Sequence, residues 1–350
     1  MSSILASGRL CSIALAIATA TTALAEVKLH VGDVAPAFKV EEWLLPTEKG
    51  LDVDLTDGKV HVIEFWATWC RPCKFSIPHL SRLQEKWGED RLQIIGVSDE
   101  KMDVVEPWVK RNLSQIGYGI ALSGKRGVQR SWFKAAGLEG IPAAFIVGPA
   151  GRVQFIGNPN DEKFEQTLIK VMDGRFDAAK AKEAAPLMKQ LRKQKEFKNW
   201  AQYEKIAQEI IAIDPKVFID IELDLFETRL VQMERSDAAY AGVKAYFETG
   251  IQTDPEGVLL YVDCIVLDPD IPDEKRDLDL ALKSATQVLE QFEDPRRQAW
   301  ALKTIAATHH QLGNTAAAVK FSQDAYRRAP ADAKEDYREQ WREYKRQIGS

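Results

Sequence analysis

Two cysteines separated by two residues, Cys70 and Cys73, are the side chains of this sequence whose spacing most clearly indicates chemistry. The apolar run 60–65 before them predicts a short buried strand, and residues 74–87 alternate apolar and charged positions at helical spacing. The pair therefore falls at a strand-to-helix junction, where free backbone N–H groups and the helix dipole favour a thiolate. Cys70 would attack a disulfide, and Cys73 would resolve the resulting mixed disulfide.

Two thiols at this spacing also form half of a structural zinc site. The other half is missing from the sequence, because Cys11 and Cys264 are single and distant from the pair. The adjacent His309 and His310 would point to different faces of a helix and so make no ligand pair. We therefore favour redox chemistry, expect no metal and no other cofactor, and expect Cys264 to be a buried small apolar residue.

Residues 62–78 resemble the active-site segment of the thioredoxin superfamily, and the run Phe-Trp-Ala-Thr-Trp-Cys over 65–70 is typical of TlpA-like (AhpC/TSA/redoxin-type) periplasmic thiol-disulfide oxidoreductases. The resemblance covers residues 30–173. It implies that Glu64 is a buried acid beneath the cysteines and that Pro78 kinks the first active-site helix. It also implies that Ile141 and Pro142 form a loop with a cis proline facing the disulfide.

Glu64 is the third catalytic candidate, beside the two cysteines. A carboxyl group buried on an apolar strand would have a raised pKa and could exchange protons with Cys73; the alternative is a strand-end glutamate that reaches solvent. The sequence departs from the family here in two ways. The lysine that often pairs with this acid would fall near Gly96, and the glutamate expected three residues after the second cysteine is Ser76.

Substrate binding is expected from five residues around the pair: Trp69, Arg71, Pro72, Ile141 and Pro142. Arg71 would favour the Cys70 thiolate if it lies close, or it points into solvent. A cis bond before Pro142 would expose the Ile141 backbone to an extended substrate, whereas a trans bond would make this a plain loop. We also expect Trp66, Trp69 and Phe133 to line one groove, with Trp69 the most exposed.

The 350 residues are 45% hydrophobic and 28% charged, and the formal net charge of -5 excludes the basic surface that nucleic-acid binding needs. Residues 1–25 carry Arg9 as their only charged side chain and end in Ala-Leu-Ala. They predict a signal peptide cleaved after Ala25, with an uncleaved anchor as the alternative. Export would place the chain in a disulfide-permissive compartment, which the resemblance identifies as the periplasm.

Residues 26–173 show strands at 92–97, 118–122, 143–147 and 153–156, alternating with helices at 104–113, 128–136 and 163–172. This order predicts an α/β domain with a central mixed sheet and helices on both faces, which is the thioredoxin fold that the resemblance implies. Segments 31–38 and 53–55 predict an N-terminal β-hairpin extension.

Residues 174–350 predict an all-α domain. Prolines 215, 255, 295 and 330 are spaced by 40, 40 and 35 residues, which indicates stacked helix pairs. The last unit, 302–330, resembles a tetratricopeptide repeat, with Gly313 at the turn and Ala318 and Ala325 at packing positions. We favour a degenerate, repeat-like array, and a plain helical bundle is the alternative.

Two functions remain open. The favoured one is an exported thiol-disulfide oxidoreductase, acting on protein disulfides or thiols, whose helical domain binds a client or partner. The resemblance favours a reductase, recycled by an electron donor in the membrane. The alternative is an interaction protein in which the helical array is the working part and the thioredoxin-like domain is a redox sensor. A peroxidase is disfavoured, because peroxiredoxins have a threonine three residues before the nucleophilic cysteine, whereas Thr68 lies only two residues before Cys70.

Overall fold

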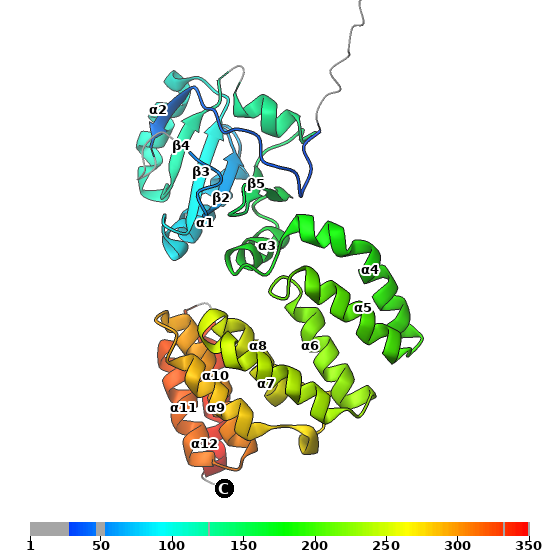
Figure 1. The fold of residues 1–350 in the computed structure, drawn as a ribbon. Coiled ribbons are helices and arrows are strands. Elements are labelled where there is room, and N and C mark those ends of the chain that lie inside the picture. The colour runs from blue at the N-terminus through cyan, green and yellow to red at the C-terminus, as the bar shows by residue number, and fades with distance from the viewer. Residues whose placement is uncertain (1–27, 47–52, 125–126, 332, 349–350) are drawn as a thin grey trace, which may run out of the picture.

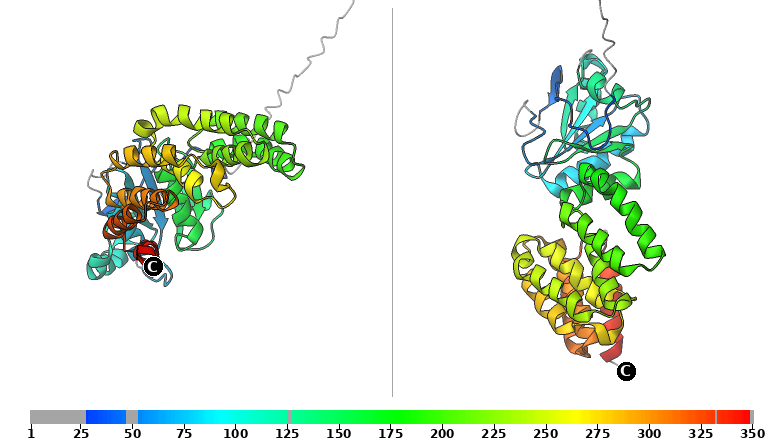
Figure 2. Two further views of the ribbon diagram at one scale, coloured as in Figure 1. Left: turned by 90° about the horizontal axis from the view of Figure 1, so that it is seen from below. Right: turned by 45° about the vertical axis from the view of Figure 1, so that its right-hand side comes forward.

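The computed structural model describes residues 28–46, 53–124, 127–331 and 333–348 (Figure 1). The expected signal peptide, its cleavage site after Ala25 and Cys11 lie outside these ranges. The chain forms an α/β domain followed by a helical domain, and the two lie at opposite ends of the molecule (Figure 2). None of the described helices combines the length and the apolar character that crossing a bilayer requires.

The α/β domain is built on one six-stranded sheet in the order β1-β4-β3-β2-β5-β6. Strands β2, β3 and β4 are parallel to one another, while β1, β5 and β6 each run antiparallel to their neighbours, so the expected mixed sheet is confirmed. Every residue of β2, β3, β4 and β5 is buried, as strands covered on both faces should be. The bounds are Glu42–Leu45, Val60–Phe65, Leu92–Ser98, Gly119–Leu122, Ala143–Val147 and Val153–Gly157 for β1 to β6.

The prediction of an N-terminal hairpin is wrong for the described residues. Strand β1 instead pairs antiparallel with β4, and Val34 forms an isolated bridge with Arg152. The open edge of β4 offers β1 a partner far away in the sequence, which no local pattern reveals. Asp54 accepts hydrogen bonds from the backbone N–H and the hydroxyl of Thr56, and this local turn competes with strand pairing at 53–55.

Helices cover both faces of the sheet, as expected. One face packs against α1, α2 and α3, and the other against the N-terminal segment and η2, which is a π-helix where an ordinary helix was expected. Val62 and Ile63 show the alternation, since they belong to the cores on opposite faces. The bounds are Cys73–Trp87, Met102–Asn112 and Glu162–Met172 for α1 to α3, and Gln129–Lys134 for η2; a 3-10 turn, η1, spans Leu113–Gln115.

The helical domain runs from α4 to α12, and each helix packs mainly against its neighbours in the chain (Figure 1). Two of the spaced prolines, Pro255 and Pro295, are the first residues of α8 and α10, each behind an aspartate that caps the helix. The bounds are Ala178–Glu196, Trp200–Ile213, Ile219–Glu227, Ser236–Thr253, Pro255–Leu267, Leu278–Leu289, Pro295–Gln311, Thr315–Arg328 and Lys334–Ile348 for α4 to α12, with a short π-helix, η3 (Thr228–Gln232), and a 3-10 turn, η4 (Asp273–Lys275).

The last predicted helix pair is present as α10 and α11. Gly313 adopts a left-handed backbone conformation (φ 76°) in the turn between them. A residue with a side chain would be strained in this conformation. Ala318 and Ala325 are fully buried, as packing positions of the second helix should be. Membership of the tetratricopeptide class stays a prediction.

The helical domain attaches to the end of the sheet that lies far from the cysteines. Because β5 is antiparallel to β2, its first residue lies beside Phe65 and the cysteine pair, while the β5–β6 turn lies at the other end. Gln154, just after that turn, accepts a hydrogen bond from the first residue of α4 at 2.7 Å. The helical domain therefore leaves the cysteine end of the sheet uncovered.

Candidate active site

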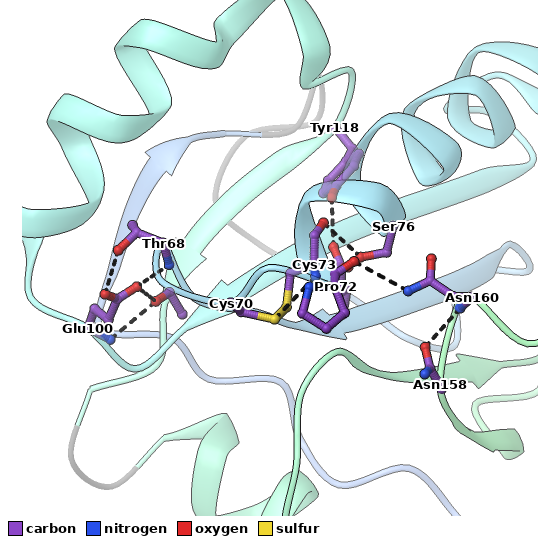
Figure 3. Close-up of a disulfide and its surroundings, with 11 residues drawn as sticks. Thr68, Cys70, Pro72, Cys73, Ser76, Glu100, Tyr118, Asn158 and Asn160 are labelled. Atoms are coloured by element: carbon purple, nitrogen blue, oxygen red, sulfur yellow. Dashed lines mark hydrogen bonds between the residues drawn. A yellow bond between two sulfur atoms is a disulfide. The ribbon is translucent and has the colours of Figure 1, made fainter.

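Cys70 and Cys73 form a disulfide at the N-terminus of α1 (Figure 3). Cys73 is the first residue of the helix, and its backbone N–H donates to the Sγ atom of Cys70 at 3.2 Å. Both cysteines are buried. When the disulfide is reduced, an N–H group and a helix N-terminus aimed at one sulfur favour its thiolate form, so the arrangement selects Cys70 as the nucleophile.

Glu100, which the sequence reasoning missed, holds the loop before the nucleophile. Its carboxylate accepts from the Thr68 backbone N–H at 2.7 Å and from the Thr68 hydroxyl at 2.8 Å (Figure 3). Glu100 lies in the loop just after β3, and Thr68 lies in the loop just after β2. The sequence could have indicated this contact, because parallel strands bring their carboxyl ends, and the residues that follow them, to the same edge of the sheet.

Glu64 is fully buried on β2, which excludes the solvent-exposed alternative. The Ser76 hydroxyl donates to one carboxylate oxygen at 2.5 Å, and the Tyr118 hydroxyl donates to the other at 2.7 Å. Ser76 also lies 3.0 Å from the carbonyl oxygen of Cys73. The serine that replaces the family's glutamate is therefore a direct partner of Glu64, and it links this acid to the backbone of the second cysteine.

Burial raises the pKa of the Glu64 carboxyl to about 7, although the two hydroxyl donors act in the opposite direction. The pKa of Tyr118 is raised well above its usual value, first by burial and then by the neighbouring carboxylate, so it stays a hydrogen-bond donor. The Glu64 carboxyl can therefore release or take up a proton near neutral pH. That is the property required of a proton-transfer group.

Gly96 explains how Tyr118 reaches Glu64. It lies opposite Glu64 in the parallel pairing of β2 with β3. A Cβ atom at Gly96 would lie 3.1 Å from the Tyr118 ring and 2.9 Å from the Ile120 side chain, which is too close for both. The position where the family often has a lysine is thus a glycine without a side chain, and Tyr118, the residue just before β4, fills the space.

Three of the five expected substrate-binding residues flank Cys70 in the chain, and Ile141 and Pro142 precede Ala143, which pairs with Phe65 at the cysteine end of the sheet. The bond between Ile141 and Pro142 is cis, as the resemblance implied. Pro142 is buried and Ile141 is half-buried, while Trp69, Arg71 and Pro72 are exposed. Arg71 points into solvent, the second of the two alternatives. Their roles in binding stay predictions.

The prediction that Trp66, Trp69 and Phe133 line one groove is wrong. Trp69 is exposed, but Trp66 is buried and packs against Trp108 with ring centroids 5.0 Å apart. Phe133 packs against Phe65, at 5.4 Å, in the core on the other face of the sheet. The alternation of side chains along β2 separates Trp66 from Phe65, and so from Phe133.

A further contact comes from the loop between β6 and α3, which the sequence reasoning did not consider. The side-chain amide of Asn160 donates to the Pro72 carbonyl oxygen at 3.4 Å (Figure 3). This bond ties the loop to the turn between the two cysteines. Asn158 in turn accepts from the Asn160 backbone N–H at 2.9 Å, so the loop has its own internal support.

The remaining candidates lie in the helical domain and do not join this site. Cys264 is half-buried against the helical core, and burial raises the pKa of its thiol to about 12. It is therefore less buried than expected but equally unsuited to attack a disulfide. His309 stacks on Phe321 and His310 stacks on Tyr344, so the two rings point to different partners, as expected.

Comparison with known proteins places this geometry in a family. Residues 31–156 match the AhpC/TSA family. The chain is 28% identical over 148 residues to the thiol-disulfide oxidoreductase ResA of Bacillus thuringiensis (strain Al Hakam), covering 41% of this chain and 80% of ResA. It is 32% identical over 128 residues to the thiol:disulfide interchange protein HelX of Rhodobacter capsulatus, covering 35% of this chain and 64% of HelX.

Among solved structures, the chain is similar to a thiol:disulfide interchange protein of the thioredoxin family from Chlorobium tepidum TLS. The identity is 23%, the TM-score is 0.32, and the match covers 40% of this chain and 99% of the other. The sequence matches and the disulfide at the start of α1 agree on one type of domain. The α/β domain of this chain is a TlpA-like thiol-disulfide oxidoreductase domain of the thioredoxin superfamily.

Proposed function

We propose that this chain is an exported thiol-disulfide oxidoreductase that reduces disulfides in protein clients. The observation that carries the proposal is the N–H group of Cys73 directed at the Cys70 sulfur, at the N-terminus of α1. The direction and the compartment are supported by the TlpA-like sequence and by the predicted signal peptide. The disulfide seen here is then the product state of one turnover.

In the proposed reaction the Cys70 thiolate attacks a client disulfide, forming a mixed disulfide and releasing one client thiolate. Glu64 then accepts the proton of the Cys73 thiol, and the Cys73 thiolate attacks the Cys70 sulfur. The client leaves with two thiols, and the protein is oxidised to its Cys70–Cys73 disulfide. A pKa of about 7 lets Glu64 accept this proton and release it again at neutral pH.

The client is held, in this proposal, by the surface around the disulfide. The backbone of Ile141, presented by the cis bond before Pro142, pairs with an extended client segment. Trp69 supplies an exposed aromatic contact, and Pro72 keeps the turn between the cysteines in shape. Arg71 is exposed beside the nucleophile and adds positive charge to the surface that meets the client.

The helical domain is proposed to bind a partner protein. Its attachment at the far end of the sheet supports this role, because a partner held there leaves the cysteines accessible. Ion pairs fix the attachment: Arg175 lies 3.3 Å from Asp254, and Arg297 joins Glu256 at 2.5 Å and Asp173 at 3.9 Å. A membrane-bound electron donor that restores the dithiol completes the proposed set of partners.

The test is a trapping experiment in cells with the variant Cys73→Ser, which can form a mixed disulfide but cannot resolve it. Mass spectrometry should find client peptides attached to Cys70, and the double variant Cys70→Ser/Cys73→Ser should trap none. Absence of any mixed disulfide would overturn the catalytic proposal. Equilibration of the full chain with glutathione buffers tests the direction, since a potential close to that of a strong oxidant would exclude a reductase.

A further inference from the structure

Two strongly exposed aromatic side chains lie next to the disulfide. Three aromatic side chains stand out as strongly exposed: Trp69 at 71%, Phe75 at 69% and Phe197 at 66%. Two of these lie within five residues of Cys70, one before it and one in the first turn of α1. Exposed aromatic groups that converge on a reactive site are typical of surfaces that a partner completes.

Two cations accompany these aromatic groups. Arg71 and Lys74 are exposed, and neither forms an ion pair within the part of the chain that the structure describes. The N-terminus of α1 adds partial positive charge at the same place. The nearby acid Glu100 uses both carboxylate oxygens on Thr68. Arg71 and Lys74 thus place two positive charges beside the disulfide, in a chain whose formal net charge is -5.

We infer that the client segment reduced here carries an acidic side chain close to its cysteine and an apolar side chain beside it. The inference rests on the proposed function and specifies its substrate class. The acidic group would meet Arg71 and Lys74, and the apolar group would contact Phe75. Residues two positions from the client cysteine lie about 7 Å from it in an extended segment, which long cationic side chains can reach.

The reaction that reports this preference is the proposed one, run on peptides. The reduced protein supplies two thiols, and a peptide with one intramolecular disulfide is the oxidant. The Cys70 thiolate breaks the peptide disulfide and forms the mixed disulfide; the Cys73 thiolate then forms the Cys70–Cys73 bond. The peptide gains two electrons and two protons, and the protein loses both.

The experiment compares two such peptides that differ only beside the cysteine, one with glutamates and a leucine and the other with lysines and a leucine. The pre-reduced full chain should react about five- to tenfold faster with the glutamate peptide at 0.1 M salt, from two exposed charge pairs. At 1 M salt, where screening acts within about 3 Å, the ratio should fall below about twofold. A ratio near one at both salt concentrations would overturn the inference.

Variants assign the preference to particular side chains. Lys74→Gln and Arg71→Gln should each lower the glutamate-to-lysine ratio about two- to threefold. The ratio is the readout because it cancels any change in the reactivity of Cys70. Lys86→Gln is the matched control, since it removes the same charge from the last turn of the same helix, about 18 Å away, and should leave the ratio unchanged.

The apolar contact has its own pair of variants. Phe75→Ala should slow reduction of the leucine-containing peptide about threefold or more, relative to a peptide with glycine at that position. Phe197→Ala removes an equally exposed aromatic group in the helical domain and should have no effect. Reduction of a small uncharged disulfide distinguishes failure of the client preference from failure of the proposed function. If it is reduced normally while the peptides show no preference, only the client preference is wrong; if it is not reduced, the proposed function fails.

Discussion

Replacing Glu64 with glutamine should make the protein more stable at high pH and leave its stability almost unchanged at low pH. Burial raises the pKa of this carboxyl from 4.5 to about 7. In the folded protein the carboxyl therefore holds its proton over a pH range in which the unfolded chain has lost it. Stability must then fall as the pH rises through this range, because the folded state binds more protons than the unfolded state.

The size of the effect follows from the shift. One pKa unit is worth 1.36 kcal/mol, so the ionised carboxyl costs the folded state about 3 kcal/mol at pH 8 and above. Glutamine keeps the size of the side chain without the charge. Its amide can bond to the hydroxyls of Ser76 and Tyr118, since each hydroxyl can accept as well as donate. The difference in unfolding free energy between variant and parent should therefore grow by up to about 3 kcal/mol between pH 4.5 and 7 and then stay constant.

The assay is urea unfolding of the oxidised full chain at several pH values, followed by pulsed hydrogen exchange of peptides from β2 and β3. These peptides report the α/β domain separately from the helical domain. Glu85→Gln, an exposed substitution on α1, controls for the loss of a carboxyl group as such. A stability difference between the Glu64 variant and the parent that does not change with pH would refute the reasoning.

Three further substitutions test the surroundings of the pair. Tyr118→Phe removes a donor that favours the charged form of Glu64, so the Glu64 pKa should rise, measured as an upward shift in the pH dependence of mixed-disulfide resolution. Gly96→Ala should destabilise the α/β domain by about 1 to 3 kcal/mol in urea, because its Cβ would meet the tyrosine ring; an unchanged midpoint would contradict the packing argument. Glu100→Ala should cost about 1 to 3 kcal/mol by leaving the Thr68 backbone N–H without its partner, and equal stability would show that this loop is held by other contacts.

Local sequence patterns predicted those parts of the site that are formed by neighbouring residues. The strand before Cys70, the helix that begins at Cys73 and the cis bond before Pro142 all follow from short segments and from the family resemblance. The alternation of strands and helices likewise predicted the mixed sheet, because hydrophobic periodicity is set within each element.

Contacts between distant segments were missed. Tyr118 reaches Glu64 across 54 positions, and Glu100 reaches Thr68 across 32, so neither contact leaves a mark in a local pattern. Both follow once the parallel pairing of the strands is known. The N-terminal hairpin was mispredicted for the same reason, since β1 finds its partner at the free edge of β4, a strand far along the chain.

The central claim is that Cys70, at the N-terminus of α1, is ionised near neutral pH, and alkylation of the reduced full chain tests it most directly. The rate of modification of Cys70, followed by mass spectrometry as a function of pH, should have its midpoint at least one unit below about 8.5, the value for an ordinary cysteine. Cys264, whose thiol pKa burial raises to about 12, serves as the internal reference and should react far more slowly. A midpoint for Cys70 near that of an ordinary cysteine would contradict the account.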